Sequence, residues 1–349
     1  MIVLMQFGAT EAQVHGVCDT IAGFGLEPLV LPGDRTAVGI PSAIPQELRD
    51  SLESALGALE GVSKVTQVSR PYKLASMEWE RRPTSVKVKP DVVFGPGQFH
   101  VIGGPCSIES YDQLREAADV IKEAGATVLR GGAFKPRTSP YSFQGLALEG
   151  LKIMRTVGGE TGLATITEVM SADMVGTVAE YVDILQIGAR SMQNFPLLVE
   201  AGKSHKPVFL KRGPAALIDE FLLAAEYILN QGNPNVILCE RGIFPIDRSY
   251  TRNTLDLASV CVLKEYSHLP VVVDPSHGTG VARYVAPMAK AAVVAGADGL
   301  MVEMHPNPKA ALSDGSQALT PDQFRGLMRD VHALRRFLSE QELARANED

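Results

Sequence analysis

Short apolar runs alternate with amphipathic stretches along the whole chain, and the alternation changes character near residue 99. Before that point, four apolar runs predict strands and two stretches with apolar side chains at helical spacing predict helices. The runs are 2–7, 26–31, 36–40 and 62–68, and the helical stretches are 14–21 and 48–59. The order βαββαβ predicts a ferredoxin-like domain over residues 1–70. The Pro-containing, locally basic residues 71–97 predict a linker with one hairpin.

Residues 98–349 repeat a different unit, in which a short apolar run is followed by a helical stretch. The eight runs are 99–103, 127–130, 164–167, 184–187, 208–210, 236–239, 271–273 and 299–302. The last helical stretch, 324–338, follows Thr320 and Pro321, a favourable N-cap and first-turn pair. Eight β/α units in about 240 residues predict a (β/α)8 TIM barrel. A doubly wound open sheet is the competing α/β architecture, because a count of units does not prove closure.

The composition, 45% hydrophobic and 21% charged residues, is that of an ordinary globular protein. The formal net charge of -7 argues against nucleic acid as a partner. No apolar run reaches the ~18 residues of a membrane span, and no Lys or Arg precedes Arg35, where a signal peptide would be basic. The four cysteines lack CxxC spacing, so we expect reduced thiols and a cytoplasmic protein without a membrane partner.

The predicted strand ends carry many cations for an acidic protein. In a TIM barrel the catalytic groups lie at the carboxyl ends of the strands, so these cations would converge at one end. Without enough acids nearby they would repel one another unless an anion binds. Arginine suits phosphate or carboxylate, and we expect an anion site rather than a rim of solvated ion pairs. The cations are Arg130, Lys135, Arg137, Arg190, Lys211, Arg212 and Arg241.

A second group follows strands one, seven and eight, which become neighbours when the barrel closes. It consists of Cys106, His277, Glu303 and Asp314. A thiolate, an imidazole and two carboxylates suit Mn, Fe, Co or Zn better than Ca or Mg. Taken singly, a Cys after a strand is more often a small buried hydrophobe, and a His a hydrogen-bonded structural residue. His305 is a rival ligand if the last strand continues that far.

The segments at these strand ends resemble the type I beta subclass of the 3-deoxy-D-arabino-heptulosonate 7-phosphate (DAHP) synthases, the first enzymes of the shikimate pathway. The matching motifs occur in the family's order and cover residues 99 to about 315. They are Gly104-Pro105-Cys106-Ser107, Lys135-Pro136-Arg137-Thr138-Ser139, Gly188-Ala189-Arg190, Lys211-Arg212-Gly213, Asp274-Pro275-Ser276-His277 and the Glu303 stretch. Members with an N-terminal ferredoxin-like regulatory domain are similar over the whole chain.

The resemblance implies a metal-dependent condensation of phosphoenolpyruvate with erythrose 4-phosphate that releases phosphate. It implies that Arg130, Ala189, Arg190, Lys211 and Arg241 bind phosphoenolpyruvate, and that Pro136, Arg137 and Thr138 bind the sugar phosphate. Lys135 would give a proton to the aldehyde oxygen, and Glu168 would steer the attacking water. His277 would serve the chemistry as a ligand, together with Cys106, Glu303 and Asp314, of a divalent metal ion that polarises the aldehyde.

Two other functions remain open at this point. The related synthase of 3-deoxy-manno-octulosonate 8-phosphate uses arabinose 5-phosphate, and its members typically show Lys-Ala-Asn-Arg where this chain has Lys135-Pro136-Arg137-Thr138. A non-catalytic sensor on the same barrel would have lost Cys106, Lys135 or His277, and none is lost.

The resemblance also bears on regulation. We expect residues 1–70 to bind Tyr or Phe within a homo-oligomer, a tetramer being favoured. The bound amino acid would inhibit by stabilising an assembly in which these domains cover the barrel mouth. The alternative is a domain that only holds the oligomer together.

Overall fold

The structure is a computed structural model, and it describes the chain apart from residues 32, 34, 43, 67–70, 136–140 and 347–349. The chain forms two compact units, Met1–Arg81 and Arg82–Asp349. Residues 71–97, expected as a linker, are therefore divided between the two units. Within the described part of the chain, no helix has the length and apolar character needed to cross a membrane.

The first unit is an antiparallel sheet with two helices. Its elements are β1 (Ile2–Met5), α1 (Glu11–Gly23), β2 (Leu29–Leu31), β3 (Ala37–Gly39), α2 (Gln46–Gly57) and β4 (Val62–Thr66). The strands are ordered β2-β3-β1-β4, which is the ferredoxin-like arrangement that the sequence predicted. Thr10 begins α1 with a capping box, because its side chain accepts from the backbone of Gln13 and the Gln13 side chain accepts in return.

Residues 71–81 pack within the first unit through two side chains. The ammonium of the buried Lys73 donates to the carbonyl oxygens of Ile40 and Pro41, at 2.6 and 3.0 Å. The Trp79 ring lies so close to Gly39 that a Cβ there would be 1.5 Å from it. This part of the expected linker is thus integral to the small domain, because a buried lysine and an indole fix it in place.

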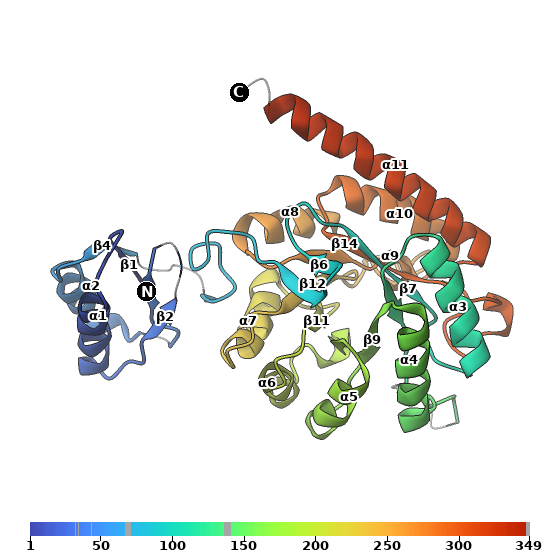
Figure 1. Cartoon of the computed structure of the whole chain (residues 1–349), viewed down its shortest axis with the longest axis horizontal. Helices are drawn as coiled ribbons and strands as arrows, with labels where there is room; N and C mark the ends of the chain where they lie inside the picture. The colour runs from blue at the N-terminus through green and yellow to red at the C-terminus, as the bar shows by residue number, and fades with distance from the viewer. Residues whose placement is uncertain (32, 34, 43, 67–70, 136–140, 347–349) are drawn as a thin grey trace. The chain divides into compact units, whose positions relative to one another are not determined.

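The second unit is a closed barrel of eight parallel strands with helices around it (Figure 1). The closed order β10-β11-β12-β13-β14-β7-β8-β9 confirms the predicted TIM barrel and excludes the open sheet. The strands are β7 (His100–Gly104), β8 (Val128–Arg130), β9 (Ala164–Glu168), β10 (Ile184–Ile187), β11 (Val208–Lys211), β12 (Val236–Glu240), β13 (Val271–Val273) and β14 (Gly299–Glu303).

Each helix around the barrel follows a strand and covers its outer face. They are α3 (Tyr111–Glu123), α4 (Ala147–Thr161), α5 (Val175–Tyr181), α6 (Phe195–Lys203), α7 (Ile218–Leu229), α8 (Leu257–Tyr266), α10 (Ala282–Val294) and α11 (Pro321–Ala346). A short helix, α9 (Pro275–Thr279), follows β13 directly. The predicted N-cap of α11 is present, since Thr320 and Gln323 exchange side-chain and backbone hydrogen bonds.

A hairpin of β5 (Val86–Lys89) and β6 (Val92–Phe94) closes the amino-terminal end of the barrel. Val86, Val92 and Phe94 join a core cluster that contains at least one residue from each of the eight barrel strands. Lys89 donates to the carbonyl of Leu163, immediately before β9. The lower part of the barrel interior is therefore apolar and filled, which leaves the carboxyl ends of the strands as the place for chemistry.

Candidate active site

The polar side chains at the carboxyl ends of the strands follow from strand alternation. Residues two apart on a strand point to the same face, so each residue two positions after an interior apolar residue also points into the barrel. Val128 is followed in this way by Arg130, and Met301 by Glu303. The same rule places five further polar residues after core positions: Glu168, Gln186, Lys211, Arg241 and Asp274. These side chains form a polar layer at the mouth, the end of the barrel opposite the hairpin.

Three of the four expected metal ligands come together at this mouth. The ligand atoms of Cys106, His277 and Glu303 all lie within 4.8 Å of one another. The rival ligand His305 is not part of this group, and β14 ends two residues before it, at Glu303. The His305 ring instead accepts from the backbone of Asn307 through Nδ1 and has Nε2 3.5 Å from the Glu109 carboxylate.

Asp314, the fourth expected ligand, is joined to the group through Cys106. Its Oδ2 accepts a hydrogen bond from the Cys106 thiol at 3.0 Å, and its Oδ1 lies 3.1 Å from the Arg252 guanidinium. The backbone of Asp314 has φ of 53°, in the left-handed region that residues other than glycine seldom adopt. Arg252 was not singled out in the sequence, because nothing in its neighbourhood indicates which acid it reaches.

Burial and neighbouring charges shift the pKa values of all three clustered residues. Burial, helped by the Glu303 charge, raises the pKa of the Cys106 thiol to about 12. Burial lowers the pKa of His277, which keeps its imidazole neutral. Burial would raise the pKa of Glu303, but the neighbouring His277 ring and the Arg130 guanidinium outweigh it and lower the pKa to about 2. A neutral imidazole and an ionised carboxylate are ready to bind a metal ion, whereas the thiol must first lose its proton.

Asp274 is a buried acid that holds two site residues at once. One of its carboxylate oxygens is 2.7 Å from Nδ1 of His277 and 2.6 Å from Nζ of Lys211. The His277 imidazole therefore donates through Nδ1, which leaves Nε2 facing Glu303 at 3.2 Å. The sequence placed Asp274 at a strand end but gave it no role, although its position three residues before a candidate ligand was a usable signal.

The cations of the mouth are paired with the acids of the cluster. Arg130 donates to Glu303 at 2.5 Å, and both side chains are buried. The Lys135 ammonium is 2.8 Å from the Cys106 sulfur and 3.1 Å from the Cys106 carbonyl oxygen. Cations and candidate ligands thus form one network, so the two groups that the sequence separated are parts of a single site.

The other residues that we expect to bind anions differ in their exposure to solvent. Arg241 is half-buried, and burial lowers the pKa of its guanidinium. Arg190 is exposed and Ala189 half-buried, in the single turn 189–191 that follows β10. Pro136, Arg137 and Thr138 lie outside the described residues.

Arg212 does not belong to the anion-binding group, contrary to the expectation from sequence. It follows Lys211 directly, so strand alternation directs it away from the barrel interior. Its guanidinium is 2.9 Å from both Glu240 and Asp256, and it also donates to the carbonyl of Ala216. Arg212 therefore joins β11 to β12 and to the start of α8, which is a structural role.

Glu168 reaches the mouth from the end of β9, as expected. Gln186, on the neighbouring β10, donates to its carboxylate at 3.3 Å. The other carboxylate oxygen lies 2.0 Å from where a Cβ on Gly188 would be. Residue 188 must therefore be glycine for Glu168 to keep this position.

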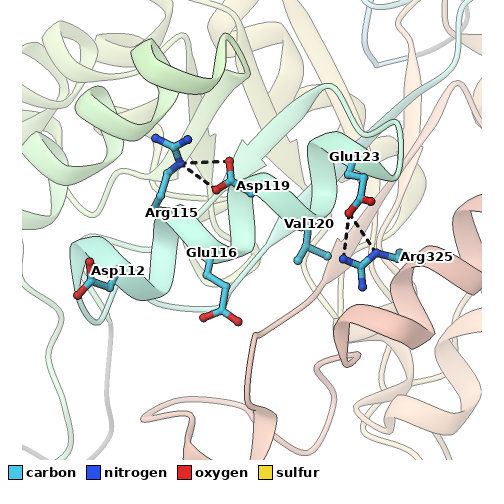
Figure 2. A pocket seen from close by; sticks show the side chains of 7 residues that line it. All are labelled: Asp112, Arg115, Glu116, Asp119, Val120, Glu123 and Arg325. Carbon is cyan, nitrogen blue, oxygen red and sulfur yellow. Dashed lines mark hydrogen bonds and ion pairs between the residues drawn. The ribbon is translucent and has the colours of Figure 1, made fainter.

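A cleft of about 360 Å³ on the outer surface, between α3 and the start of α11, is separate from this mouth (Figure 2). Within it, Arg115 pairs with Asp119 and Arg325 with Glu123, at 3.0 Å in both cases. Both arginines of the lining are thus paired, and its other side chains are carboxylates and Val120, so the cleft offers no group comparable to the cluster at the mouth. The chemistry therefore concentrates at the barrel mouth.

Known proteins share both the sequence and the fold of this chain. Residues 81–338 match the model of the DAHP synthetase I family. A phospho-2-dehydro-3-deoxyheptonate aldolase of Thermotoga maritima is 45% identical over 96% of this chain and 97% of its own. A 2-dehydro-3-deoxyphosphooctonate aldolase of Syntrophobacter fumaroxidans is 35% identical over 69% of this chain and 89% of its own.

Solved structures agree with these sequence matches. The crystal structure of the Thermotoga maritima DAHP synthase aligns with a TM-score of 0.77 and 43% identity over 97% of both chains. A truncated form of the Thermotoga maritima synthase aligns with a TM-score of 0.71 and 44% identity, covering 76% of this chain and 97% of that one. By the extent of these matches and by the residues at the barrel mouth, the chain belongs to the DAHP synthetase I family.

Proposed function

We propose that the chain is a DAHP synthase, which condenses phosphoenolpyruvate with erythrose 4-phosphate to give DAHP and inorganic phosphate. This reaction is the first step of the shikimate pathway to the aromatic amino acids. The observation that carries the proposal is the single network in which buried cations adjoin a Cys/His/Glu cluster at one barrel mouth. Two phosphorylated substrates, one of which also carries a carboxylate, account for the cations.

Arg130, Lys211, Arg190 and Arg241, with the backbone turn at Ala189, would bind phosphoenolpyruvate. The support is their arrival from neighbouring strand ends and the fixed position of two of them. Arg130 is held by Glu303 and Lys211 by Asp274, so neither has to find its conformation when the anion binds. Pro136, Arg137 and Thr138 would bind the phosphate of the sugar, in accordance with the family motif at those positions.

Cys106, His277 and Glu303, with Asp314 beside them, would hold a divalent Mn, Fe, Co or Zn ion. One sulfur, one nitrogen and carboxylate oxygens are donors for such borderline metals. When bound, the ion would act as a Lewis acid on the aldehyde group of erythrose 4-phosphate. Asp274 supports this assignment, because a carboxylate on the far nitrogen of a ligand histidine is the usual way of fixing its ring and tautomer.

Lys135 would donate a proton to the aldehyde oxygen while C3 of phosphoenolpyruvate forms a bond to the aldehyde carbon. The Lys135 ammonium lies beside Cys106. Lys135 is also the last described residue before the sugar-phosphate motif. Glu168 would orient the water whose oxygen adds to C2. The C2–O bond to the phosphate group then breaks with its electron pair, phosphate leaves with that bridging oxygen, and the added oxygen loses its protons to become the C2 carbonyl oxygen.

The sugar specificity needs a direct test, because relatives at about one third identity are named phosphooctonate aldolases. Phosphate release should be measured with phosphoenolpyruvate and either erythrose 4-phosphate or arabinose 5-phosphate. The proposal predicts a higher kcat/KM for the four-carbon sugar. A higher kcat/KM for the pentose would assign the chain to the octulosonate reaction, and no turnover with either would favour a non-catalytic sensor.

The first unit would regulate the enzyme rather than take part in the chemistry. Residues 1–81 form a compact unit, and every described site residue comes from the second unit. We expect Tyr or Phe as the effector and a homo-oligomer, a tetramer by preference, as the working form. All four cysteines are free thiols, which supports a reducing compartment such as the cytoplasm.

A further inference from the structure

Gln317 is a fully buried amide beside the candidate metal cluster, and the function described above gives it no role. It lies in the loop between β14 and α11, and its Nε2 donates to Oε2 of Glu303 at 2.5 Å. Its Oε1 is buried and has no hydrogen-bond partner among the described residues. One end of this side chain is therefore tightly engaged, and the other is left unsatisfied.

The orientation of the amide follows from the chemistry of Glu303. The other oxygen of that carboxylate is 2.5 Å from Arg130 and 3.2 Å from His277. An ionised carboxylate only accepts hydrogen bonds, so Gln317 must present its NH₂ group and direct its carbonyl elsewhere. A buried carbonyl without a partner is destabilising, so what this side chain contributes is the hydrogen bond from its NH₂ group to Glu303.

The backbone of Gln317 holds the second carboxylate of the cluster. Its N–H donates to the carbonyl oxygen of Asp314 at 3.2 Å, which closes a turn over residues 314–317. The loop that contains this turn is closed at its base, where Leu319 donates to the carbonyl of Glu303 at 2.9 Å. Gln317 thus fixes Glu303 with its side chain and the turn that presents Asp314 with its main chain.

We propose that Gln317 is a positioning residue that sets the affinity of the cluster for its metal ion by holding Glu303 and the Asp314 turn in one arrangement. It contacts the carboxylate of Glu303 and the backbone of Asp314. The inference rests on the proposed function, in which Cys106, His277 and Glu303 bind the metal. Partners of this kind around ligands change metal affinity by about 10- to 100-fold when they are removed.

The test uses the full-length Q317L variant, which removes both the donor to Glu303 and the unpartnered carbonyl. Metal-free protein is titrated with Co²⁺, and binding is followed by calorimetry and by the absorption of the cobalt-thiolate bond. We expect a Kd about 10- to 100-fold weaker than that of the wild type. We also expect kcat to return to near the wild-type value at saturating Co²⁺, because the substrate contacts are intact.

Q113L is the matched control. Gln113 is a glutamine of α3 whose side chain donates to the carbonyl of Ser107 and accepts from the backbone of Glu109. It steadies the segment after Cys106 without touching a ligand side chain, so its loss should leave the Kd for Co²⁺ unchanged. If Q317L does not fold, Q317M, which is closest to glutamine in length, is measured with the same expectation.

The outcomes separate a failure of the role inferred for Gln317 from a failure of the metal assignment. A Kd for Q317L within about twofold of the wild type, or an equal loss in Q113L, overturns the inference and leaves the proposed function standing. A kcat that stays low at saturating metal would place Gln317 in the reaction itself and overturn the positioning role. If the wild-type chain binds no Co²⁺, the metal assignment falls and this inference falls with it.

Discussion

Replacing Asp274 by Asn should weaken metal binding and destabilise the barrel together. The Asp274 carboxylate balances the buried Lys211 ammonium at 2.6 Å and accepts from Nδ1 of His277 at 2.7 Å. An amide cannot neutralise Lys211, and its NH₂ group can face Nδ1 as a donor, which would move the ring proton to Nε2. The proton would then stand where the metal ion has to bind.

The magnitude follows from the burial of the pair, since Asp274 is fully buried and the Lys211 side chain is 5% exposed. Leaving one buried charge without its partner costs about 3–5 kcal/mol. At about 2–4 °C per kcal/mol for a domain of this size, the unfolding midpoint of the metal-free protein should fall by roughly 6–20 °C. Removing the partner of a ligand histidine should also weaken metal binding by about 10- to 100-fold.

The pH dependence of this stability difference has a definite sign. Burial opposes ionisation of Asp274, but His277 and Lys211 outweigh it and hold the pKa well below the usual 3.8. A carboxyl whose pKa is lowered by folding stabilises the native state above its ordinary pKa, and that stabilisation is lost as the pH falls through the folded value. The gap between wild type and D274N should therefore be constant near neutral pH and should narrow only in acid.

The assay pairs thermal unfolding with calorimetric titration of metal, and D298N is the control. Asp298 is also a buried acid, and it accepts from Lys264 at 2.7 Å, but it lies at the amino-terminal end of the barrel immediately before β14. D298N should lose stability and keep its metal affinity. Wild-type metal affinity in D274N, or an equal loss in D298N, would refute the role given to Asp274.

Three further predictions concern the proton donor, the thiol and the first unit. Lys135→Ala should lower kcat by ~10²-fold or more, and a near-normal kcat in steady-state assays would remove Lys135 from the chemistry. Because the Cys106 thiol has a pKa of about 12, metal affinity should rise about tenfold per pH unit near neutrality; titrations without any pH slope would argue against a thiolate ligand. Deleting residues 1–81 should leave an active barrel that ignores Tyr and Phe, and inhibition equal to that of the intact enzyme would disprove the sensor role.

The barrel could be predicted closely from the sequence, and the reason is physical. Parallel strands buried on both faces appear as continuous apolar runs, and the charged residue that ends most of these runs marks where the strand reaches the mouth. Each of the eight predicted barrel strands starts and ends within one residue of the observed strand. The cluster of Cys106, His277 and Glu303 followed, because closure of the barrel makes their strands neighbours.

The pairing of side chains inside the site could not be predicted in the same way. Arg252 reaches Asp314 and Gln317 reaches Glu303 because of the paths of long loops, which local patterns do not specify. Arg212 is different, because strand alternation alone directs its side chain to the opposite face from Lys211. Residues 71–81 of the first unit could not be assigned from local patterns either, since only tertiary contacts such as those of Lys73 show that they belong to the domain before them.

Product identification with and without metal tests whether this chain is a metal-dependent DAHP synthase. The purified full-length chain is incubated with phosphoenolpyruvate and erythrose 4-phosphate, and the product is analysed by mass spectrometry while released phosphate is counted. We expect DAHP and phosphate in equal amounts and loss of both products after complete chelation. Addition of one equivalent of Mn²⁺ or Co²⁺ per chain should restore the formation of both. Full turnover by a verified metal-free enzyme, or a product other than DAHP, would contradict it.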